Sequence, residues 1–249
     1  MKYKIVTCVT TYNRLNYISR FYKSWKNTIS EDFDHHLIIA DDGSTDGTLK
    51  FLEGISSNNV TIIKNKRVGV GRQTNTLFDA AKKIDFDFGF KADDDIWFSS
   101  NGWDHLYLNA IIKTGYEHLC YLNKKWVDPK RDEFISEFLY SKTSVISCMG
   151  CFWTFTKNVI NKVGYFDTKN FGFMGHEHID FSMRCCRAGF NDRFNFCDAK
   201  DSNKYIDMTG RKDGYNPSLS GDEIKKYNIS RSEIERRWRV ILDESRIKI

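Results

Sequence analysis

The stretch Phe86–Asp95, with the sequence FDFGFKADDD, decides the fold because an apolar run leads straight into three adjacent carboxylates. Adjacent carboxylates repel one another, and a helix cap with solvated side chains is the plainest explanation for them. A divalent cation would remove the repulsion, since Mg²⁺ or Mn²⁺ binds one or two carboxylates and leaves its other positions to water and substrate phosphates. The stretch therefore predicts a buried strand whose end holds a metal and a diphosphate, with the solvated cap as the alternative.

Two earlier apolar runs also end in polar clusters. Strands that alternate with helices at this spacing indicate βαβ units and a mostly parallel sheet, which defines an α/β protein. In open α/β sheets ligands bind beyond the carboxyl ends of the strands, so we expect one site built from residues 10–14, 41–46 and 92–96. The expected strands are Lys4–Val9, His36–Ala40, Val60–Ile63 and Phe86–Lys91, and the expected helices are Tyr17–Trp25, Thr48–Gly54 and Gly69–Ala81.

The second half of the chain predicts shorter elements. From Asp222 onward, apolar residues among alternating charges indicate an amphipathic helix. We expect residues 1–215 to form one domain and residues 216–249 to form a helical extension that packs on this domain or across a homodimer. The other expected elements are strands at Tyr121–Leu122 and Cys148–Phe155, a loop at Val127–Glu137, and helices at Lys157–Val163 and Ile179–Ala188.

Composition limits the class of protein. Of 249 residues, 41% are hydrophobic, which excludes a disordered chain. The net charge of +5 comes without a basic stripe, so it suits small anionic ligands rather than nucleic acid. No apolar run reaches the roughly 18 residues of a membrane span, and only a peripheral membrane contact through the C-terminal helix is left open. The seven cysteines, odd in number, are expected to be buried free thiols of a cytoplasmic protein.

The glycine pair Gly69-Val70-Gly71, followed by Arg72, is expected to start a helix and to bring a cation to the site. It lacks the full dinucleotide fingerprint and the lysine of a phosphate-binding loop. A Rossmann dehydrogenase and a P-loop NTPase are therefore not supported.

Four motifs occur in order along the chain. They are VTTYNR at Val9–Arg14, DDGSTD at Asp41–Asp46, ADDD at Ala92–Asp95, and GHEHIDF at Gly175–Phe181. Together they resemble the motifs of the GT-A-fold glycosyltransferases of the inverting family 2 type, over about residues 3–200. This resemblance implies a Rossmann-like α/β fold with a mixed, mostly parallel sheet flanked by helices. It also implies a nucleotide-binding half at about residues 1–100 and an acceptor-binding half at about 101–215.

The resemblance also implies roles for individual residues. The donor would be a nucleotide-sugar, most often UDP-linked, and the metal would be Mn²⁺ or Mg²⁺. Asp95 would be the direct metal ligand and Asp93 would lie toward the ribose and the metal, with the place of Asp94 left open. The residues implied to line the nucleotide pocket are Thr10, Tyr12, Arg14, Asp42, Arg72, Asp93 and Asp94.

The last motif departs from the family pattern, in which Gly-Gly-Glu-Asp is usual and the Asp is the general base. Here that position is His178, so three hypotheses are open. In the first, His178 is the base, and in the second, Glu177 is the base and His178 contacts the acceptor. Both are chemically reasonable, because imidazole and carboxylate can each take a proton near neutral pH. In the third, a histidine binds the metal. Asp180 would orient either residue or cap the helix. His176 either contacts the acceptor or packs beside Phe173.

Aromatic side chains on the acceptor side commonly stack on sugars, so Trp153, Phe173 and Trp97 are acceptor candidates. The acceptor would be the hydroxyl of a glycan, a lipid-linked sugar or a protein. Two other functions stay open: a sugar nucleotidyltransferase, and a non-catalytic carbohydrate-binding scaffold, which the missing aspartate at position 178 suggests.

Overall fold

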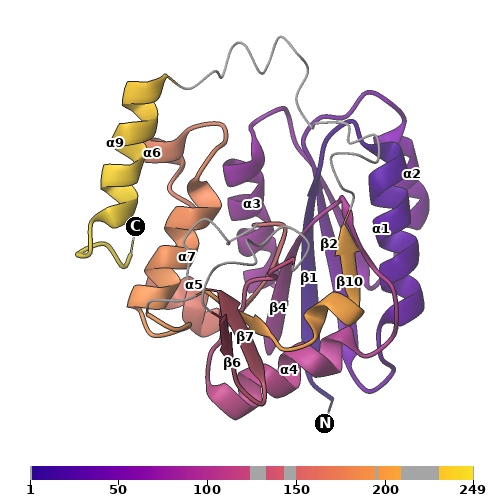
Figure 1. Cartoon of the computed structure of the whole chain (residues 1–249). Coiled ribbons are helices and arrows are strands. Elements are labelled where there is room, and N and C mark those ends of the chain that lie inside the picture. Colours follow the sequence, from indigo (N-terminus) through magenta and orange to yellow (C-terminus); the bar gives the residue numbers. More distant parts are fainter. Residues whose placement is uncertain (1, 124–132, 143–149, 194–195, 209–229, 249) are drawn as a thin grey trace.

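The computed structural model describes residues 2–123, 133–142, 150–193, 196–208 and 230–248. Its centre is a five-stranded sheet with helices on both faces (Figure 1). The strand order is β3-β2-β1-β4-β8, in which the first four strands are parallel and β8 is antiparallel to β4. The predicted α/β class and mixed, mostly parallel sheet are therefore confirmed. The strands are β1 (Lys4–Thr11), β2 (Asp34–Asp41), β3 (Val60–Lys64), β4 (Phe88–Asp93) and β8 (Phe152–Phe155).

The central strand β1 is buried on both faces because its side chains alternate between two hydrophobic clusters. Ile5 and Val9 belong to the cluster that contains residues of α1, α2 and α4. Val6 and Cys8 belong to the cluster that contains residues of α3, α5 and α7. These helices are α1 (Leu15–Thr28), α2 (Thr48–Ile55), α4 (Trp103–Thr114), α3 (Val70–Lys82), α5 (Lys157–Val163) and α7 (Glu177–Arg187).

Short strands and a 3-10 helix complete the second half. The expected strand at Tyr121–Leu122 is wrong, because these residues form no strand and only the preceding Cys120 makes an isolated bridge, to Trp153. The expected loop Val127–Glu137 contains a strand, although residues 124–132 lie outside the described part. The elements are β5 (Ile96–Phe98) paired with β10 (Ile206–Met208), the sheet of β6 (Glu133–Ile135), β7 (Leu139–Lys142) and β9 (Cys197–Ala199), and the helix η2 (Ser202–Lys204).

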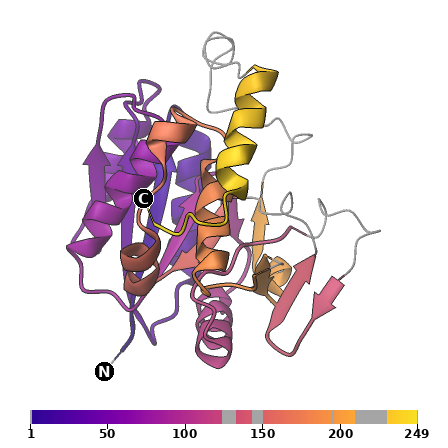
Figure 2. The same ribbon diagram turned by 90° about the vertical axis from the view of Figure 1, so that its left-hand side faces the viewer.

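The C-terminal helix α9 (Arg231–Leu242) packs beside α6 (Thr168–Phe171) and α7, as Figures 1 and 2 show. Ile241, fully buried, meets Phe171 and Ile179 in a small apolar cluster. The predicted amphipathic helix is thus present and packs on the chain's own domain. Its expected first turns at Asp222 and the expected boundary at residue 215 lie outside the described residues.

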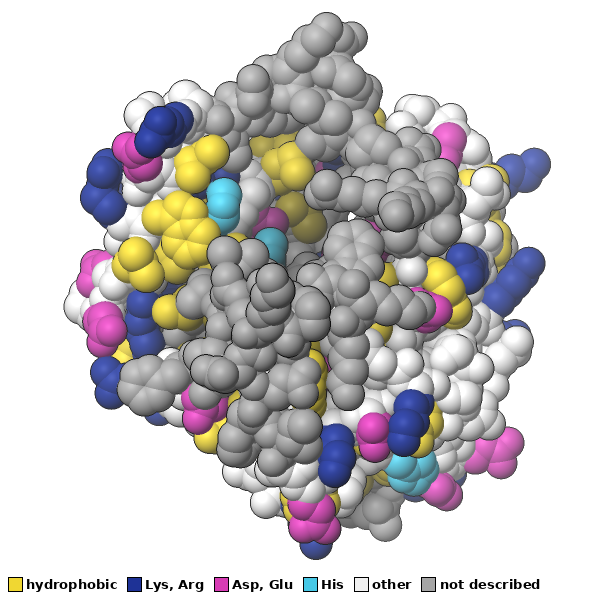
Figure 3. All heavy atoms as spheres, viewed as in Figure 1, with side chains coloured by type: hydrophobic (Ala, Val, Ile, Leu, Met, Phe, Trp, Pro, Cys, Tyr) yellow, Lys and Arg dark blue, Asp and Glu magenta, His cyan; other side chains and the backbone are white. Residues whose placement is uncertain are grey.

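The cysteines, the surface charges and the helices of the described residues can be compared with what the composition predicts. Six described cysteines are buried free thiols, as predicted, and Cys148 lies outside the described residues. On the face drawn in Figure 3, basic side chains are interspersed with acidic ones, and the described residues there form no large basic patch. None of the described helices combines the length and the apolar character that a membrane crossing requires.

A buried histidine makes the stability of the fold depend on pH. His118 donates from Nδ1 to the carbonyl oxygen of Thr154 (2.9 Å), so its Nε2 accepts from the hydroxyl of Ser182 (2.9 Å). Burial lowers the pKa of His118 to about 4. Because an unfolded histidine titrates near pH 6.5, the unfolded state gains a proton first as the pH falls, and stability is lost between about pH 6.5 and 4.

We predict that His118→Gln reduces the loss of unfolding free energy that occurs as the pH falls. The wild-type chain should lose about 1.4 kcal/mol of unfolding free energy per pH unit through this group in that window, and the variant should lose less. Urea unfolding at pH 7, 6 and 5 measures both slopes. His105→Gln, which removes a half-exposed histidine, is the control and should keep the wild-type slope. Equal slopes in wild type and His118→Gln would contradict the assignment.

Candidate active site

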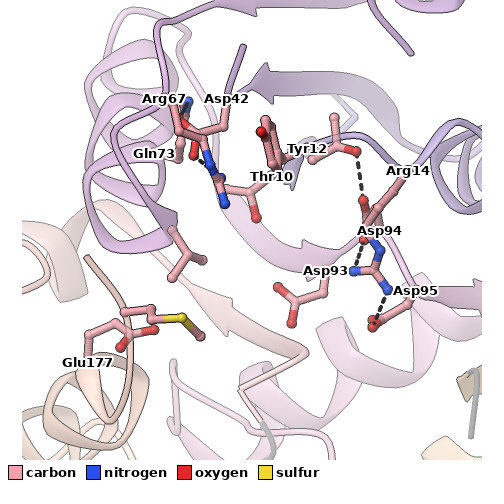
Figure 4. A pocket seen from close by; sticks show the side chains of 13 residues that line it. Thr10, Tyr12, Arg14, Asp42, Arg67, Gln73, Asp93, Asp94, Asp95 and Glu177 are labelled. Carbon is pink, nitrogen blue, oxygen red and sulfur yellow. Dashed lines mark hydrogen bonds and ion pairs between the residues drawn. The ribbon is translucent and has the colours of Figure 1, made fainter. Parts of the chain in front are cut away.

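The candidate site lies where β1, β2 and β4 end. The strand register places Thr10 opposite Asp93 and Thr11 opposite Asp41, so the polar clusters that follow these strands meet at one edge of the sheet. Figure 4 shows the pocket that results, with residues from both halves of the chain around it. The residues that line it are Thr10, Thr11, Tyr12, Arg14, Asp42, Arg67, Val70, Gln73, Asp93, Asp94, Asp95, Met174 and Glu177.

One wall is organised by Asp42, which is buried. Its carboxylate accepts from the backbone N–H groups of Val68 (2.7 Å) and Gly69 (3.0 Å) and from the amide of Gln73 (2.7 Å), and it pairs with Arg67. The Arg67 guanidinium lies 3.5 Å from the ring centroid of Tyr12. A flat cationic and aromatic surface results, of the kind on which a nucleobase can stack.

Arg67 was not among the predicted site residues. It follows β3 directly, in Asn65-Lys66-Arg67, so the polar residues after the third strand were a signal of the same kind as those after the other strands. Arg72, which was predicted to reach the nucleotide, is exposed on α3 and is not among the residues lining the pocket. A step of one residue around the helix puts Gln73 at the pocket and turns Arg72 to solvent, so a role for Arg72 at the nucleotide stays a prediction.

The opposite wall holds the three aspartates. Arg14 donates to Asp94 Oδ1 (2.7 Å) and Asp95 Oδ2 (3.0 Å), and the Thr11 hydroxyl donates to Asp94 Oδ2 (2.6 Å). Burial, aided by the neighbouring carboxylates and opposed by Arg14, raises the pKa of Asp94 to about 7. Burial and the charge of Asp93 raise the pKa of Asp95. Protein groups thus engage both oxygens of Asp94.

This wall fits a divalent cation in part. Asp95 Oδ1 is buried and has no hydrogen-bond partner within the described residues. The three carboxylates lie beside two cations, Arg14, which pairs with Asp94 and Asp95, and Lys91, which pairs with Asp93. No group of three or more potential ligands already converges among the described His, Cys, Asp and Glu side chains. A cation here would therefore need phosphate oxygens and water to complete its shell, as Mg²⁺ and Mn²⁺ usually do.

Glu177 lies across the pocket from Asp95, and the carboxylate of Asp93 extends into the space between them (Figure 4). Glu177 is the first residue of α7 and is 6% exposed. Its Oε2 is buried without a hydrogen-bond partner among the described residues. Its side chain packs over Gly71, where a Cβ atom would lie 3.8 Å from Glu177 Cγ. A buried carboxylate oxygen with no partner is poised to accept a proton from a ligand.

The two histidines beside Glu177 point elsewhere. His178 is half-buried, and its ring packs so closely on Gly150 that a Cβ atom there would lie 2.6 Å from the imidazole. His176 precedes the helix in the left-handed conformation, with φ of 69°, and its ring meets Trp238 at 5.6 Å between centroids. Burial and then Arg237 lower the pKa of His176. Neither histidine is among the described residues that line the pocket.

Asp180 does not orient Glu177 or His178. It is fully buried, with Oδ2 accepting from Arg184 (2.9 Å) and Oδ1 accepting from Arg246 (2.7 Å). Both carboxylate oxygens are therefore engaged, Oδ2 in an ion pair within α7 and Oδ1 in an ion pair between α7 and the C-terminal segment. The described contacts of Asp180 thus give no support to its predicted catalytic role, which stays a prediction.

The acceptor candidates are also placed differently from the prediction. Trp153 is 1% exposed and packs among rings of the core, such as Phe166 and Phe181, so it cannot stack on a sugar in this structure. Phe173 lies against Gly69, and its ring centroid is 4.9 Å from the Arg67 guanidinium, which puts it beside the first wall. Its acceptor role stays a prediction.

Trp97, the remaining acceptor candidate, is half-buried in β5. The guanidinium of Arg20 lies 3.2 Å from the centroid of its ring, so one face of the indole is covered. Trp97 is not among the described residues that line the pocket. Its part in acceptor binding therefore also stays a prediction.

Comparisons with known proteins match this arrangement. The model of glycosyl transferase family 2 matches residues 7–164. Over 177 residues the chain is 28% identical to an uncharacterized glycosyltransferase of Acanthamoeba polyphaga mimivirus, a match that covers 69% of this chain and 66% of the relative. The chain thus spans just under two thirds of that relative's length.

Solved structures show the same fold. S. aureus TarS in complex with UDP-GlcNAc superposes with a TM-score of 0.63 at 17% identity, over 98% of this chain and 66% of that one. GalNAc-T7 with UDP, GalNAc and Mn²⁺ gives a TM-score of 0.65 at 12% identity, over 92% of this chain and 48% of that one. These likenesses confirm the predicted GT-A fold. Because the family model covers more than half of the chain, including the ends of β1, β2 and β4, the chain belongs to glycosyl transferase family 2.

Proposed function

We propose that this protein transfers a sugar from a nucleoside diphosphate, preferably UDP, to an acceptor hydroxyl on a glycan, a lipid-linked sugar or a protein. One observation carries the proposal. Two buried carboxylate oxygens without described partners, on Asp95 and Glu177, belong to opposite sides of one pocket. A metal-dependent inverting transferase uses one carboxylate to hold the cation beside the leaving diphosphate and another as the base beside the acceptor. The TarS and GalNAc-T7 structures contain UDP-GlcNAc and UDP, respectively.

The donor would lie along the wall formed by Tyr12, Arg67 and Asp42. The nucleobase would stack on the Tyr12 and Arg67 surface, while Asp42 keeps Arg67 in place and Gln73 offers an amide. Asp93, whose side chain is one-third exposed, would face the ribose and the diphosphate. This placement follows from the position of these residues just beyond the carboxyl ends of the strands, where open α/β sheets bind their ligands.

Asp95 and Asp93 would hold Mn²⁺ or Mg²⁺, which when bound neutralises negative charge that develops on the departing nucleoside diphosphate. Arg14 keeps Asp94 and Asp95 in position through its two ion pairs. The Asp95 Oδ1 atom, which has no hydrogen-bond partner among the described residues, and the three adjacent carboxylates of this wall support the assignment. Asp94, engaged on both oxygens, would act by holding Arg14 rather than by contacting the nucleotide.

Glu177 would be the general base. Its carboxylate would take the proton of the acceptor hydroxyl as that oxygen bonds to the anomeric carbon and the bond from this carbon to the diphosphate breaks. Attack from the side of Glu177, opposite the diphosphate, inverts the anomeric configuration. His178, turned toward Gly150, would border the acceptor. It is the second candidate for the base because it occupies the family's usual base position, and a role for His178 on the metal has no supporting contact.

The free, buried thiols suit a reducing compartment, which supports a cytoplasmic location. A non-catalytic carbohydrate-binding protein is the rival within the same fold. Turnover distinguishes the two, because only the transferase releases UDP.

We predict that Glu177→Gln lowers kcat about 10²- to 10⁴-fold, because it removes the base while keeping the size of the side chain. UDP release from a panel of UDP-sugars with Mn²⁺ measures this, and the donor KM should change little. His178→Asn is the matched variant and should retain most activity. A larger loss in His178→Asn than in Glu177→Gln would move the base to His178. Sugar binding without UDP release from any donor would support the non-catalytic rival.

We also predict that UDP-sugars raise the melting temperature only when Mn²⁺ or Mg²⁺ is present. Binding to the folded state stabilises it in proportion to RT ln(1 + [L]/Kd), so the shift reports affinity. Asp95→Asn should abolish the dependence of the shift on metal, since it removes the negative charge at the partner-free oxygen. Asp87→Asn, a substitution at the opposite end of β4, is the control. Equal shifts with and without metal in the wild type would count against the metal assignment.

A further inference from the structure

The C-terminal helix α9 contacts the segment that carries Glu177. Arg237, which is 7% exposed, donates from Nη1 to the carbonyl oxygens of Met174 (2.9 Å) and Gly175 (2.8 Å). Its Nε donates to Glu233 Oε1 (2.8 Å), one turn earlier on α9. Met174 lines the pocket, and Gly175 lies two residues before Glu177. A guanidinium with fixed geometry therefore holds the backbone directly before Glu177.

The same segment is conformationally costly without this support. His176 has a φ of 69°, a left-handed conformation that is unfavourable for a residue with a side chain. The Trp238 ring, also on α9, packs edge-on against His176. The carbonyl oxygens of Met174 and Gly175 would lose charge-assisted hydrogen bonds if Arg237 were removed. Helix α9 thus compensates for strain at the residue that turns the chain into α7.

On its other side the segment meets the wall formed by Tyr12, Arg67 and Asp42, called the donor wall below. A Cβ atom on Gly69 would lie 2.4 Å from the carbonyl oxygen of Phe173 and 2.8 Å from its ring. The N–H of Gly69 donates to Asp42, so this contact joins the segment to the wall assigned to the nucleobase. Residues 173–176 are therefore held between the donor wall and α9.

Other arginines attach α9 and its C-terminal continuation without touching residues 173–176. Arg246 pairs with Asp180 (2.7 Å) and Asp167 (2.8 Å). Arg236 donates to the backbone and the side chain of Asn170 on α6 and, like Arg237, pairs with Glu233. Arg236 and Arg237 thus lie on the same helix, pair with the same glutamate and each donate to a backbone carbonyl. They differ in the segment that they bind, which is α6 for Arg236 and residues 174–175 for Arg237.

We propose that Arg237 is a positioning residue for the transfer reaction, which sets the backbone of residues 174–176 so that the Glu177 carboxylate faces the pocket. The proposal rests on the proposed role of Glu177 as the base. It gives α9 a part in the acceptor half of the site, although α9 lies beyond the residues 7–164 that match the family. Small displacements of a catalytic group cost large factors in rate, so the effect should appear in kcat.

The test compares Arg237→Met with Arg236→Met in the full chain. Arg237→Met should lower kcat about 10- to 100-fold, with the donor KM and the Kd for UDP close to wild type, whereas Arg236→Met should keep kcat near wild type. Arg237→Lys, which retains the charge but lacks the planar fork of donors of the guanidinium, should fall between them. Guanidinium ion added to Arg237→Ala should restore part of kcat. An equal loss of kcat in the two methionine variants, or unchanged kcat in Arg237→Met, would overturn the proposal.

A second measurement does not need turnover. Amide hydrogen exchange in residues 174–178 should accelerate in Arg237→Met and stay slow in Arg236→Met. If the wild type releases no UDP from any donor, the proposed function fails, and the exchange measurement still decides whether Arg237 holds this segment. Should Arg237→Met not fold, Arg237→Lys carries both measurements, and wild-type kcat and exchange in that variant would contradict the proposal.

Discussion

The rest of the site depends on one buried guanidinium. Arg14 follows β1 and binds Asp94 and Asp95 after β4, so it connects the ends of two neighbouring strands. The three side chains are nearly excluded from water, and removing one partner of a buried ion pair typically costs about 3–5 kcal/mol because an uncompensated charge is left behind. With Asp94 held on both oxygens and Asp95 on one, the remaining Asp95 oxygen and the Asp93 carboxylate are presented to the pocket.

The central sheet was predictable because each of its strands contains an apolar run followed by polar residues, which is a local pattern. The residues at which its strands begin and end were less predictable. The strand expected from Phe86 begins at Phe88, because pairing with β1 starts where Ile5 meets Phe88, while Phe86 is buried against Phe155 without being part of the ladder. Periodicity shows that a residue is buried, and it does not show which hydrogen bonds its backbone makes.

The site was predictable where its residues follow strands and less predictable where it depends on side-chain direction. Trp153 sits between Phe152 and Thr154 on a strand buried on both faces, so alternation gave no sign of which face meets the core and which the site. Asp180 was assigned to catalysis from its motif, but its decisive partner, Arg246, lies 66 residues further along the chain. A single sequence contains no local signal for such a pairing, and the same holds for Arg237.

Gly69 allows two surfaces of the pocket to approach each other closely. Its φ of 91° already disfavours any other residue, and the carbonyl and ring of Phe173 occupy the place of a Cβ atom. Because Gly69 carries only a hydrogen atom there, the turn that leads into α7 can lie directly against the wall of Asp42 and Arg67. Any larger residue at position 69 would push these two surfaces apart, so the width of the pocket depends on the smallest amino acid of the chain.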